Sequence, residues 1–145
     1  MEQAQYEKAL IANVMKNAAY AFEAFRQVPG KERAIFLEAV AQGLEKGGEY
    51  LLELALQETN LPLVRLRAEV GRTCKQLRIY ARLLNEGSWV NAIINEANSH
   101  NNPPSPDLRS MHVPIGPVVA FGASNFPFAY STAGGDTASA LAAGC

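Results

Sequence analysis

Asn125 is the residue whose type and position most strongly suggest chemistry. It follows a short apolar run, Val118 to Phe121, and a turn made by residues 122–124. Asparagine is among the best residues for capping a helix N-terminus. The position after a central strand is also where α/β folds bind ligands, and a side-chain amide there can donate to a developing oxyanion. Taken alone, the residue leaves both interpretations open.

The segment around Asn125 is almost free of charge. From Ser110 to Cys145 the only residue charged at neutral pH is Asp136. The apolar run is typical of central parallel strands, so we predict a strand over residues 114–121 and a helix over residues 126–143. Asn125 is the predicted N-cap, with a proline in the first turn and a glycine at the end. Such a segment must be covered by other elements, and we expect this chain to hold only part of the site.

Common active-site motifs are not completed here. Residues 122–126 lack the last glycine of a nucleophile elbow, because Phe126 stands in its place. Gly116 and Gly122 do not complete a G-x-G-x-x-G dinucleotide motif. The pair Gly134-Gly135 is predicted to lie inside the helix rather than at its start. His112 precedes the predicted strand, and a lone histidine is more often structural than catalytic.

The elements that must position these residues are mainly helical. Three helices are predicted before residue 60. The first ends near Pro29-Gly30, the second ends at Gly47-Gly48, and the third spans residues 49–58. A short strand is predicted over residues 89–94, followed by a turn-rich loop over residues 98–106.

Residues 62–86 form the best-defined predicted helix, with Gly87 as its predicted C-cap. Its apolar residues recur every three or four positions, and Cys74 among them is expected to be a packed thiol. The other faces are rich in arginine. Exposed arginines are ordinary on helices; alternatively, one of them receives an anionic substrate group through a bidentate pair. Spacing does not choose between these. The stripe is Leu63, Leu66, Val70, Cys74, Leu77, Ala81 and Leu84.

Length and composition exclude several classes of protein. The chain has 145 residues and a formal net charge of -1, which gives no basic footprint for nucleic acid or an anionic membrane. No uncharged apolar run approaches the length of a membrane span, and the polar N-terminus is not a signal peptide. Two cysteines make neither a disulfide framework nor a metal site. We expect a soluble, cytoplasmic protein with no metal and no nucleic-acid or membrane partner.

Three motifs resemble the N-terminal part of the aldehyde dehydrogenase family: residues 114–119 (PIGPVV), 124–127 (SNFP) and 140–144 (ALAAG). The longer stretches GRTCKQLRIYARLLNEGSWV and FGASNFPFAYSTAGGDTASALAAGC are similar to the α-ketoglutaric semialdehyde (2,5-dioxopentanoate) dehydrogenase branch. The resemblance implies an α/β fold: a helical layer over residues 1–87, an oligomerisation hairpin or loop region over 88–113, and the first strand–helix unit of a Rossmann-like cofactor domain over 114–145.

The resemblance also implies an activity and a set of site residues. Family members oxidise an aldehyde to a carboxylate with NAD or NADP, through a cysteine thiolate and a glutamate-activated water. By resemblance, Asn125 matches the oxyanion-hole amide, and Phe126 and Arg72 match substrate-tunnel positions. An arginine there suits a substrate whose far end is a carboxylate. The positions that match cofactor-lining residues are Phe121, Gly122, Ala123, Ser124 and Asn125.

The same resemblance implies that this chain is an incomplete enzyme. The catalytic cysteine, the general-base glutamate and the adenosine-binding lysine of the family all lie beyond the matched segment, and Cys145 is not the nucleophile. We therefore expect no dehydrogenase activity from the chain alone, and a homo-oligomer acting on a small-molecule aldehyde from the whole enzyme. The alternative is a small helical interaction module whose apolar C-terminal segment docks on a partner.

The isolated chain is predicted to associate. A central strand without its neighbours exposes backbone hydrogen-bonding groups and apolar faces, and both promote association. Size-exclusion chromatography should show oligomers or aggregates unless a complementing fragment is added. A monomer with a sharp cooperative melting transition would contradict this expectation.

Overall fold

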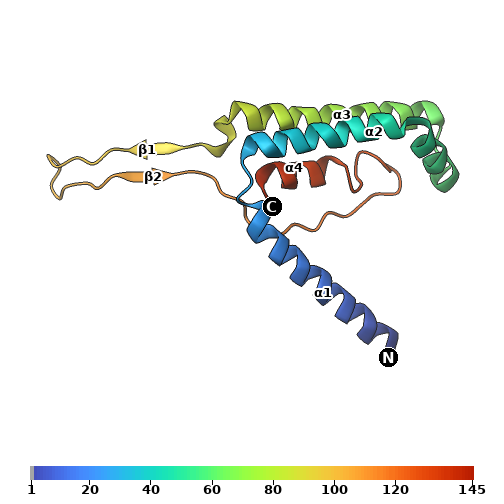
Figure 1. The fold of residues 1–145 in the computed structure, drawn as a ribbon, viewed down its shortest axis with the longest axis horizontal. Helices are drawn as coiled ribbons and strands as arrows, with labels where there is room; N and C mark the ends of the chain where they lie inside the picture. The colour runs from blue at the N-terminus through green and yellow to red at the C-terminus, as the bar shows by residue number, and fades with distance from the viewer. Residues whose placement is uncertain (1) are drawn as a thin grey trace.

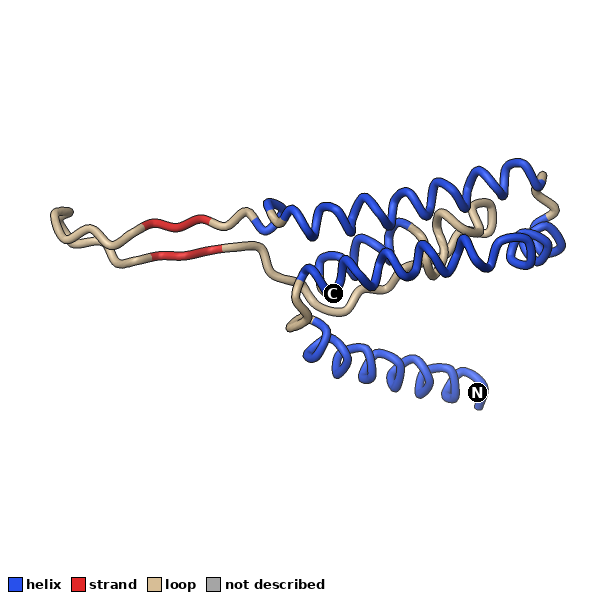
Figure 2. The backbone as a smooth tube through the Cα atoms, turned by 45° about the horizontal axis from the view of Figure 1, so that its top comes forward, coloured by secondary structure: helices blue, strands red, loops and turns tan. Residues whose placement is uncertain are grey.

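Two long helices lie side by side and form the body of the molecule in the computed structural model, which describes residues 2–145 (Figure 1). They are α2 (Gly30–Thr59) and α3 (Leu63–Glu86), and the short helix α4 (Gly135–Ala143) packs against both. Helix α1 (Glu2–Phe25) points away from this body, and a long hairpin leaves it in another direction (Figure 2).

Helix α3 confirms the predicted apolar stripe. Leu66, Cys74 and Leu77 are almost completely buried, since residues three and four apart share one face of a helix. The helix ends at Gly87, which has a φ of 88° and donates its N–H to the carbonyl of Leu83. Glycine adopts this left-handed conformation without a steric penalty, so the C-cap prediction is also confirmed.

Helix α2 contains the predicted break at residues 47–48. Gly48 has a φ of 29° and a ψ of -116°, which is not helical, although the helix continues on both sides of it. The predicted third helix is therefore the part of α2 that follows this kink. Asn60 ends it with a φ of 54°, a conformation that asparagine tolerates better than most residues.

The core lies where α2, α3 and α4 meet. Leu37 and Ala41 from α2 pack against Cys74 and Leu77 from α3, with Ala138 from α4 closing the group. The Cys74 thiol donates to the carbonyl of Ala41 at 3.5 Å, and burial raises the pKa of the thiol. The expectation that Cys74 is a packed thiol is confirmed. A second cluster joins the far ends of α2 and α3 to the C-terminal segment through Leu52, Ala55, Leu66 and Phe128.

Helix α1 keeps most of its apolar stripe exposed. Leu10 and Val14 are 51% and 56% exposed, whereas Phe22 and Phe25 near its end are half-buried. The end of α1 lines an apolar groove of about 590 Å³ together with Pro117, Val118, Leu141 and Cys145. Within residues 2–145, none of the helices has both the length and the apolar content that crossing a membrane requires.

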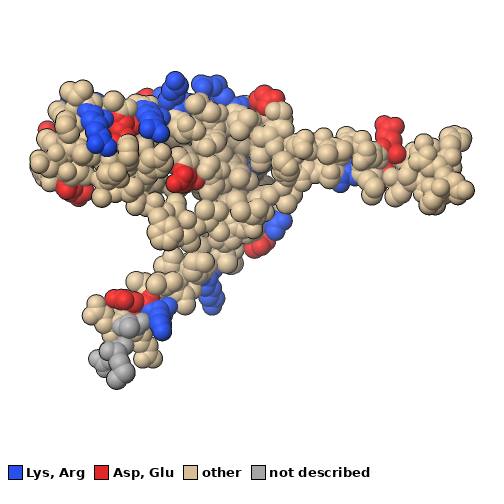
Figure 3. Space-filling view, turned by 180° about the vertical axis from the view of Figure 1, so that it is seen from behind, with Lys and Arg blue, Asp and Glu red and all other residues tan. Residues whose placement is uncertain are grey.

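The hairpin consists of β1 (Ile93–Asn95) and β2 (Leu108–Ser110), which pair antiparallel with Ile93 opposite Ser110 and Asn95 opposite Leu108. The predicted strand over residues 89–94 was placed too early, because residues 88–90 form a 3₁₀ turn instead. The strand at residues 108–110 was not predicted. Both strands are exposed, and few charged side chains lie along the hairpin compared with the helical body (Figure 3).

The predicted strand over residues 114–121 does not form. This segment has no regular structure, and Ile115 and Phe121 are 91% and 84% exposed. A central strand requires neighbouring strands to pair with its N–H and C=O groups. The only sheet within residues 2–145 is the β1–β2 hairpin, so this segment has no partner to pair with.

The predicted helix over residues 126–143 is also much shorter in the structure. Residues 124–134 form a series of turns, and α4 begins only at Gly135, so its N-cap is Gly134 and not Asn125. Gly134-Gly135 thus starts the helix rather than lying inside it. The physical reason is that Gly134 is extended, with a φ of -74° and a ψ of -178°, and glycine is a poor helix former, so one helix cannot run from residue 126 to 143. The predicted end at Gly144 is confirmed, with a φ of 91°.

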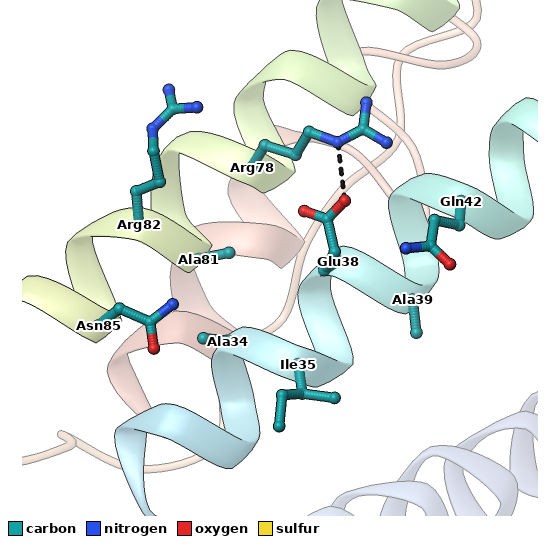
Figure 4. A pocket seen from close by; sticks show the side chains of 9 residues that line it. All are labelled: Ala34, Ile35, Glu38, Ala39, Gln42, Arg78, Ala81, Arg82 and Asn85. Atoms are coloured by element: carbon teal, nitrogen blue, oxygen red, sulfur yellow. Dashed lines mark hydrogen bonds and ion pairs between the residues drawn. The ribbon is translucent and has the colours of Figure 1, made fainter.

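Arg78 joins α2 and α3 on their outer side. Its guanidinium donates to the Glu38 carboxylate at 2.9 Å (Figure 4) and to both oxygens of Glu45 at 2.6 and 2.8 Å. A groove of about 400 Å³ lies between the two helices, and its lining includes Ile35 of α2 and Arg82 of α3. The hydrogen bonds from Arg78 hold the pKa of Glu45 below its ordinary value.

We predict that Glu45→Gln weakens the fold at neutral pH but not in acid. A carboxyl whose pKa is lower in the folded state binds protons more tightly in the unfolded chain. Its contribution is therefore present above the ordinary pKa of about 4.3 and is lost as the pH falls through the folded value. Urea unfolding, followed by circular dichroism at about pH 7 and about pH 3, should show a lower midpoint for the variant only at the higher pH. Glu53→Gln, at an exposed position of α2, is the control. A midpoint difference that grows in acid would contradict the prediction.

Candidate active site

Residues 122–134 form a folded loop that rests on α3, and we call them the site loop. The loop closes on itself through backbone hydrogen bonds: Ala123 donates to the carbonyl of Tyr130 at 2.8 Å, and Tyr130 donates to the carbonyl of Phe126 at 3.1 Å. The rings of Phe126 and Tyr130 meet edge to face with centroids 5.4 Å apart. These contacts give the loop a defined shape without a helix.

Glu69 of α3 attaches the middle of the site loop to the body. One carboxylate oxygen accepts hydrogen bonds from the N–H groups of Phe128 and Ala129 at 2.8 and 2.9 Å. The side chain is buried, with only 5% of the residue exposed, and Phe128 packs beside it in the second core cluster with Leu66. Hydrogen bonds from a backbone to a charged acceptor are roughly twice as strong as neutral ones, so this is a firm attachment.

Arg65 holds the beginning of the loop. Its guanidinium donates to the backbone carbonyl of Asn125 at 2.5 Å and lies 4.9 Å from the centroid of the Phe126 ring. Arg65 is one turn before Glu69 on the same helix, so the two side chains reach the loop from neighbouring positions on one face.

Arg72 reaches the end of the loop. Its guanidinium lies 6.0 Å from the centroid of the Tyr130 ring, and one of its N–H groups donates to the Tyr130 hydroxyl across a long 3.5 Å. Both residues are exposed enough to bind a small molecule. The geometry leaves most of the guanidinium's donors free to receive a planar anionic group such as a carboxylate.

Two small cavities open on either side of Tyr130. One, of about 320 Å³, is lined by Gly122, Ala123 and Ser124, which are three of the expected cofactor-binding residues. Ser131, Thr132 and Thr137 also line it, and the hydroxyls of Ser131 and Thr137 donate to the carbonyls of Phe128 and Ser131. The other, of about 170 Å³, lies between α3 and the start of α4 and is lined by Arg72, Thr73 and Asp136 among others.

The structure brings the expected site residues to one region but not into one pocket. Gly122, Ala123 and Ser124 share a cavity, and Phe126 and Arg72 are linked through Tyr130. Phe121 and Asn125 are exposed, and neither lines these two cavities. The contact that Asn125 makes here is through its backbone carbonyl.

Sequence reasoning missed Tyr130 and the roles of Arg65 and Glu69. A signal for Glu69 was present, because it lies three residues after Leu66 and four before Thr73, and all three are buried on one face of α3. A charged residue within a buried stripe is informative, since buried charges are nearly always paired. No comparable signal identified Tyr130, because its position depends on how the loop turns.

The sequence matches the model of the aldehyde dehydrogenase family across residues 1–145. The chain belongs to the aldehyde dehydrogenase family. It is 53% identical over 126 residues to α-ketoglutaric semialdehyde dehydrogenase 2 of Azospirillum brasilense, which covers 86% of this chain and 24% of that protein. It is also 46% identical over 144 residues to the α-ketoglutaric semialdehyde dehydrogenase of Acinetobacter baylyi, and this match covers 97% of this chain and 27% of that protein.

A more distant relative is the 4-(hydroxymethyl)benzenesulfonate dehydrogenase TsaD1 of Comamonas testosteroni, which is 30% identical over 131 residues; the match covers 90% of this chain and 26% of that protein. The chain thus spans about a quarter of the length of the curated relatives it matches. The match over the whole chain favours an enzyme over the interaction module considered above.

The lining of the larger cavity is compatible with part of a nicotinamide cofactor. Gly122 and Ala123 present little side chain, so a flat or bulky group can approach their backbone, and a hydroxyl of the lining such as that of Thr132 can exchange hydrogen bonds with a ribose. A cavity of about 320 Å³ is smaller than a whole dinucleotide, so only the part nearest these residues fits here.

We predict that Gly134→Ala disrupts the site loop and that Gly135→Ala does not. A Cβ at Gly134 would lie 2.5 Å from the carbonyl oxygen of Ala129 and 2.6 Å from the backbone nitrogen of Ser131, and neither can move cheaply. At Gly135 the nearest atoms would be 3.9 Å away, and alanine favours helices over glycine by about 0.5–1 kcal/mol.

Urea unfolding of the two variants tests this pair directly. Gly134→Ala should lower the unfolding midpoint, and Gly135→Ala should leave it unchanged or raise it. Equal midpoints for the two variants would show that the loop does not approach Gly134 as closely as described.

Proposed function

We propose that this chain is part of an NAD- or NADP-dependent aldehyde dehydrogenase that oxidises α-ketoglutaric semialdehyde to a dicarboxylate. The family membership of residues 1–145 supports the reaction class. The substrate is supported by 53% and 46% identity to two proteins named for that activity. The observation that carries the proposal is the match over the whole chain, combined with a loop of matched site residues held on one face of α3.

The same proposal assigns a role to each part of the chain. Residues 1–87 serve as the helical layer, residues 88–113 contact a second copy of the enzyme, and residues 114–145 form the first strand–helix unit of the cofactor domain. The exposed apolar residues Ile93, Ile94 and Leu108 of the hairpin suit burial against another copy. The segment 114–121 would become a strand when neighbouring strands pair with it.

The site loop supplies groups that bind and polarise. Asn125 is proposed to donate its side-chain amide to the aldehyde oxygen, where negative charge develops during attack on the carbonyl. Phe121, Gly122, Ala123 and Ser124 are proposed to line the cofactor, which accepts a hydride when bound. Phe126, held between Arg65 and Tyr130, is proposed to form part of the wall of the substrate tunnel.

Arg72 is proposed to bind the carboxylate at the far end of the substrate. It is exposed beside a cavity of about 170 Å³, and its contact with the Tyr130 hydroxyl orients the guanidinium toward the site loop. A semialdehyde of a dicarboxylic acid carries such a carboxylate, whereas simple aldehydes do not. The proposal therefore assigns Arg72 to substrate choice and Asn125 to the chemical step.

The dehydrogenase that includes this chain tests the reaction class. We expect it to reduce NAD or NADP in the presence of α-ketoglutaric semialdehyde, measured by the absorbance of the reduced nicotinamide. A purified, folded enzyme that reduces neither cofactor with this or any other aldehyde would refute the proposed function.

We predict that Arg72→Ala raises the KM for α-ketoglutaric semialdehyde about tenfold or more, because a charge-assisted pair to the substrate carboxylate is lost. The KM for a neutral aldehyde of similar length should change little. Arg82→Ala, ten positions later on α3 and bordering the groove of Figure 4, is the matched control and should affect neither aldehyde. Equal changes in KM for the two aldehydes after Arg72→Ala would refute the assignment.

A further inference from the structure

We propose that Glu69 is a positioning residue of the enzyme: its buried carboxylate fixes the backbone of the site loop and thereby sets the place of the Asn125 amide. The anchoring of the loop follows from the structure of the chain alone. The effect on catalysis rests on the proposed function, so the two parts are tested separately.

The geometry of the anchor is specific. A single oxygen of Glu69 accepts from two successive backbone N–H groups, those of Phe128 at 2.8 Å and Ala129 at 2.9 Å. These bonds join positions 59 and 60 residues apart in the sequence, so they are tertiary contacts and not part of a helix. Phe128 and Ala129 are themselves buried, which shields the bonds from competing water.

Burying the Glu69 carboxylate costs free energy unless the site loop is in place to donate hydrogen bonds to it. Its second oxygen is buried and has no hydrogen-bond partner among the described residues. An ionised group in the interior must be compensated by hydrogen bonds or opposite charge. Arg65 and Arg72 flank it on α3, but their guanidinium groups contact Asn125 and Tyr130 instead. The two N–H groups of the loop are therefore the direct compensation, and carboxylate and loop stabilise each other.

A short series of bonds connects the anchor to Asn125. Tyr130, next to the anchored Ala129, donates to the carbonyl of Phe126, and Phe126 donates to the carbonyl of Ala123. Asn125 lies between the ends of these turns, and Arg65 binds its carbonyl. Freeing Phe128 and Ala129 from Glu69 would release the turn whose other end carries Asn125.

Small displacements of a catalytic group have large effects. A shift of about 1 Å in a positioned group can reduce a rate about 100-fold. An oxyanion donor acts when charge develops, so its misplacement lowers kcat more than it raises the KM. Substitution of a residue that only stabilised the fold would not lower kcat more than it raised the KM once the enzyme is folded.

The anchor is tested by amide hydrogen exchange at Phe128 and Ala129 in the dehydrogenase that includes this chain, with neither aldehyde nor cofactor added. Glu69→Ala should speed exchange at both amides about tenfold or more. Glu69→Gln keeps an acceptor oxygen of the same reach and should give a smaller increase. Glu38→Gln removes a carboxylate of α2 that pairs with Arg78 and is the matched control, with no change at these amides. The proposal is overturned if both amides exchange at the same rate in Glu69→Ala and Glu69→Gln as in the unmodified protein.

The catalytic effect is tested in the dehydrogenase that includes this chain. Glu69→Ala should lower kcat about 100-fold with a much smaller change in the KM for the aldehyde, and Glu69→Gln should restore most of the rate. If Glu69 acts through Asn125, the double variant Glu69→Ala with Asn125→Ala should be no slower than Asn125→Ala alone. If the loss in kcat of the double variant equals the product of the losses in the two single variants, the link between Glu69 and Asn125 is overturned.

The design separates this inference from the proposed function. Where Glu69→Ala fails to fold, Glu69→Gln, which has the same size and shape, provides both measurements: a smaller rise in exchange and a smaller loss of kcat support the inference, and no change in either overturns it. An enzyme that oxidises no aldehyde overturns the proposed function and the catalytic part of this inference, while the exchange rates still decide whether Glu69 anchors the loop.

Discussion

The contact between the apolar stripe of α3 and the facing stripe of α2 is the interaction on which the rest of the structure depends. Leu37, Ala41, Cys74 and Leu77 exclude water along this contact, and their burial supplies the main favourable free energy for ordering the helices. Arg78, with Glu38 and Glu45, joins the same helices at their outer edge. Exposed ion pairs of this kind contribute modestly, so the apolar contact dominates.

Helix α3 also carries the polar side chains that shape the candidate site. Arg65, Glu69 and Arg72 recur at steps of four and three, so one face of the helix reaches three points of the site loop. The loop has no strand or helix of its own and depends on these contacts for its shape. A rigid helix thus positions residues that belong to an irregular segment, an arrangement common in binding and catalytic sites.

The C-terminal segment is where sequence reasoning and structure differ most. The run from residue 114 to 121 has the composition of a central strand, yet it is exposed and irregular, and Asn125 is exposed beyond it. A strand is formed by its neighbours as much as by its own residues, because its hydrogen bonds are made between chains or segments. Membership of the aldehyde dehydrogenase family therefore rests on the match across residues 1–145 and not on the geometry around Asn125.

What the sequence determined by itself is local and periodic: the α3 stripe, the packed Cys74, the break at Gly48 and the caps at Gly87 and Gly144. These features depend on neighbours within about one helical turn, so composition and spacing are enough to find them. Only the tertiary structure decided that Glu69 binds the backbone of the loop, that Tyr130 lies between two cavities, and that residues 124–134 are turns. Each of these depends on contacts between positions about 60 residues apart, because local propensity is weak and distant partners override it.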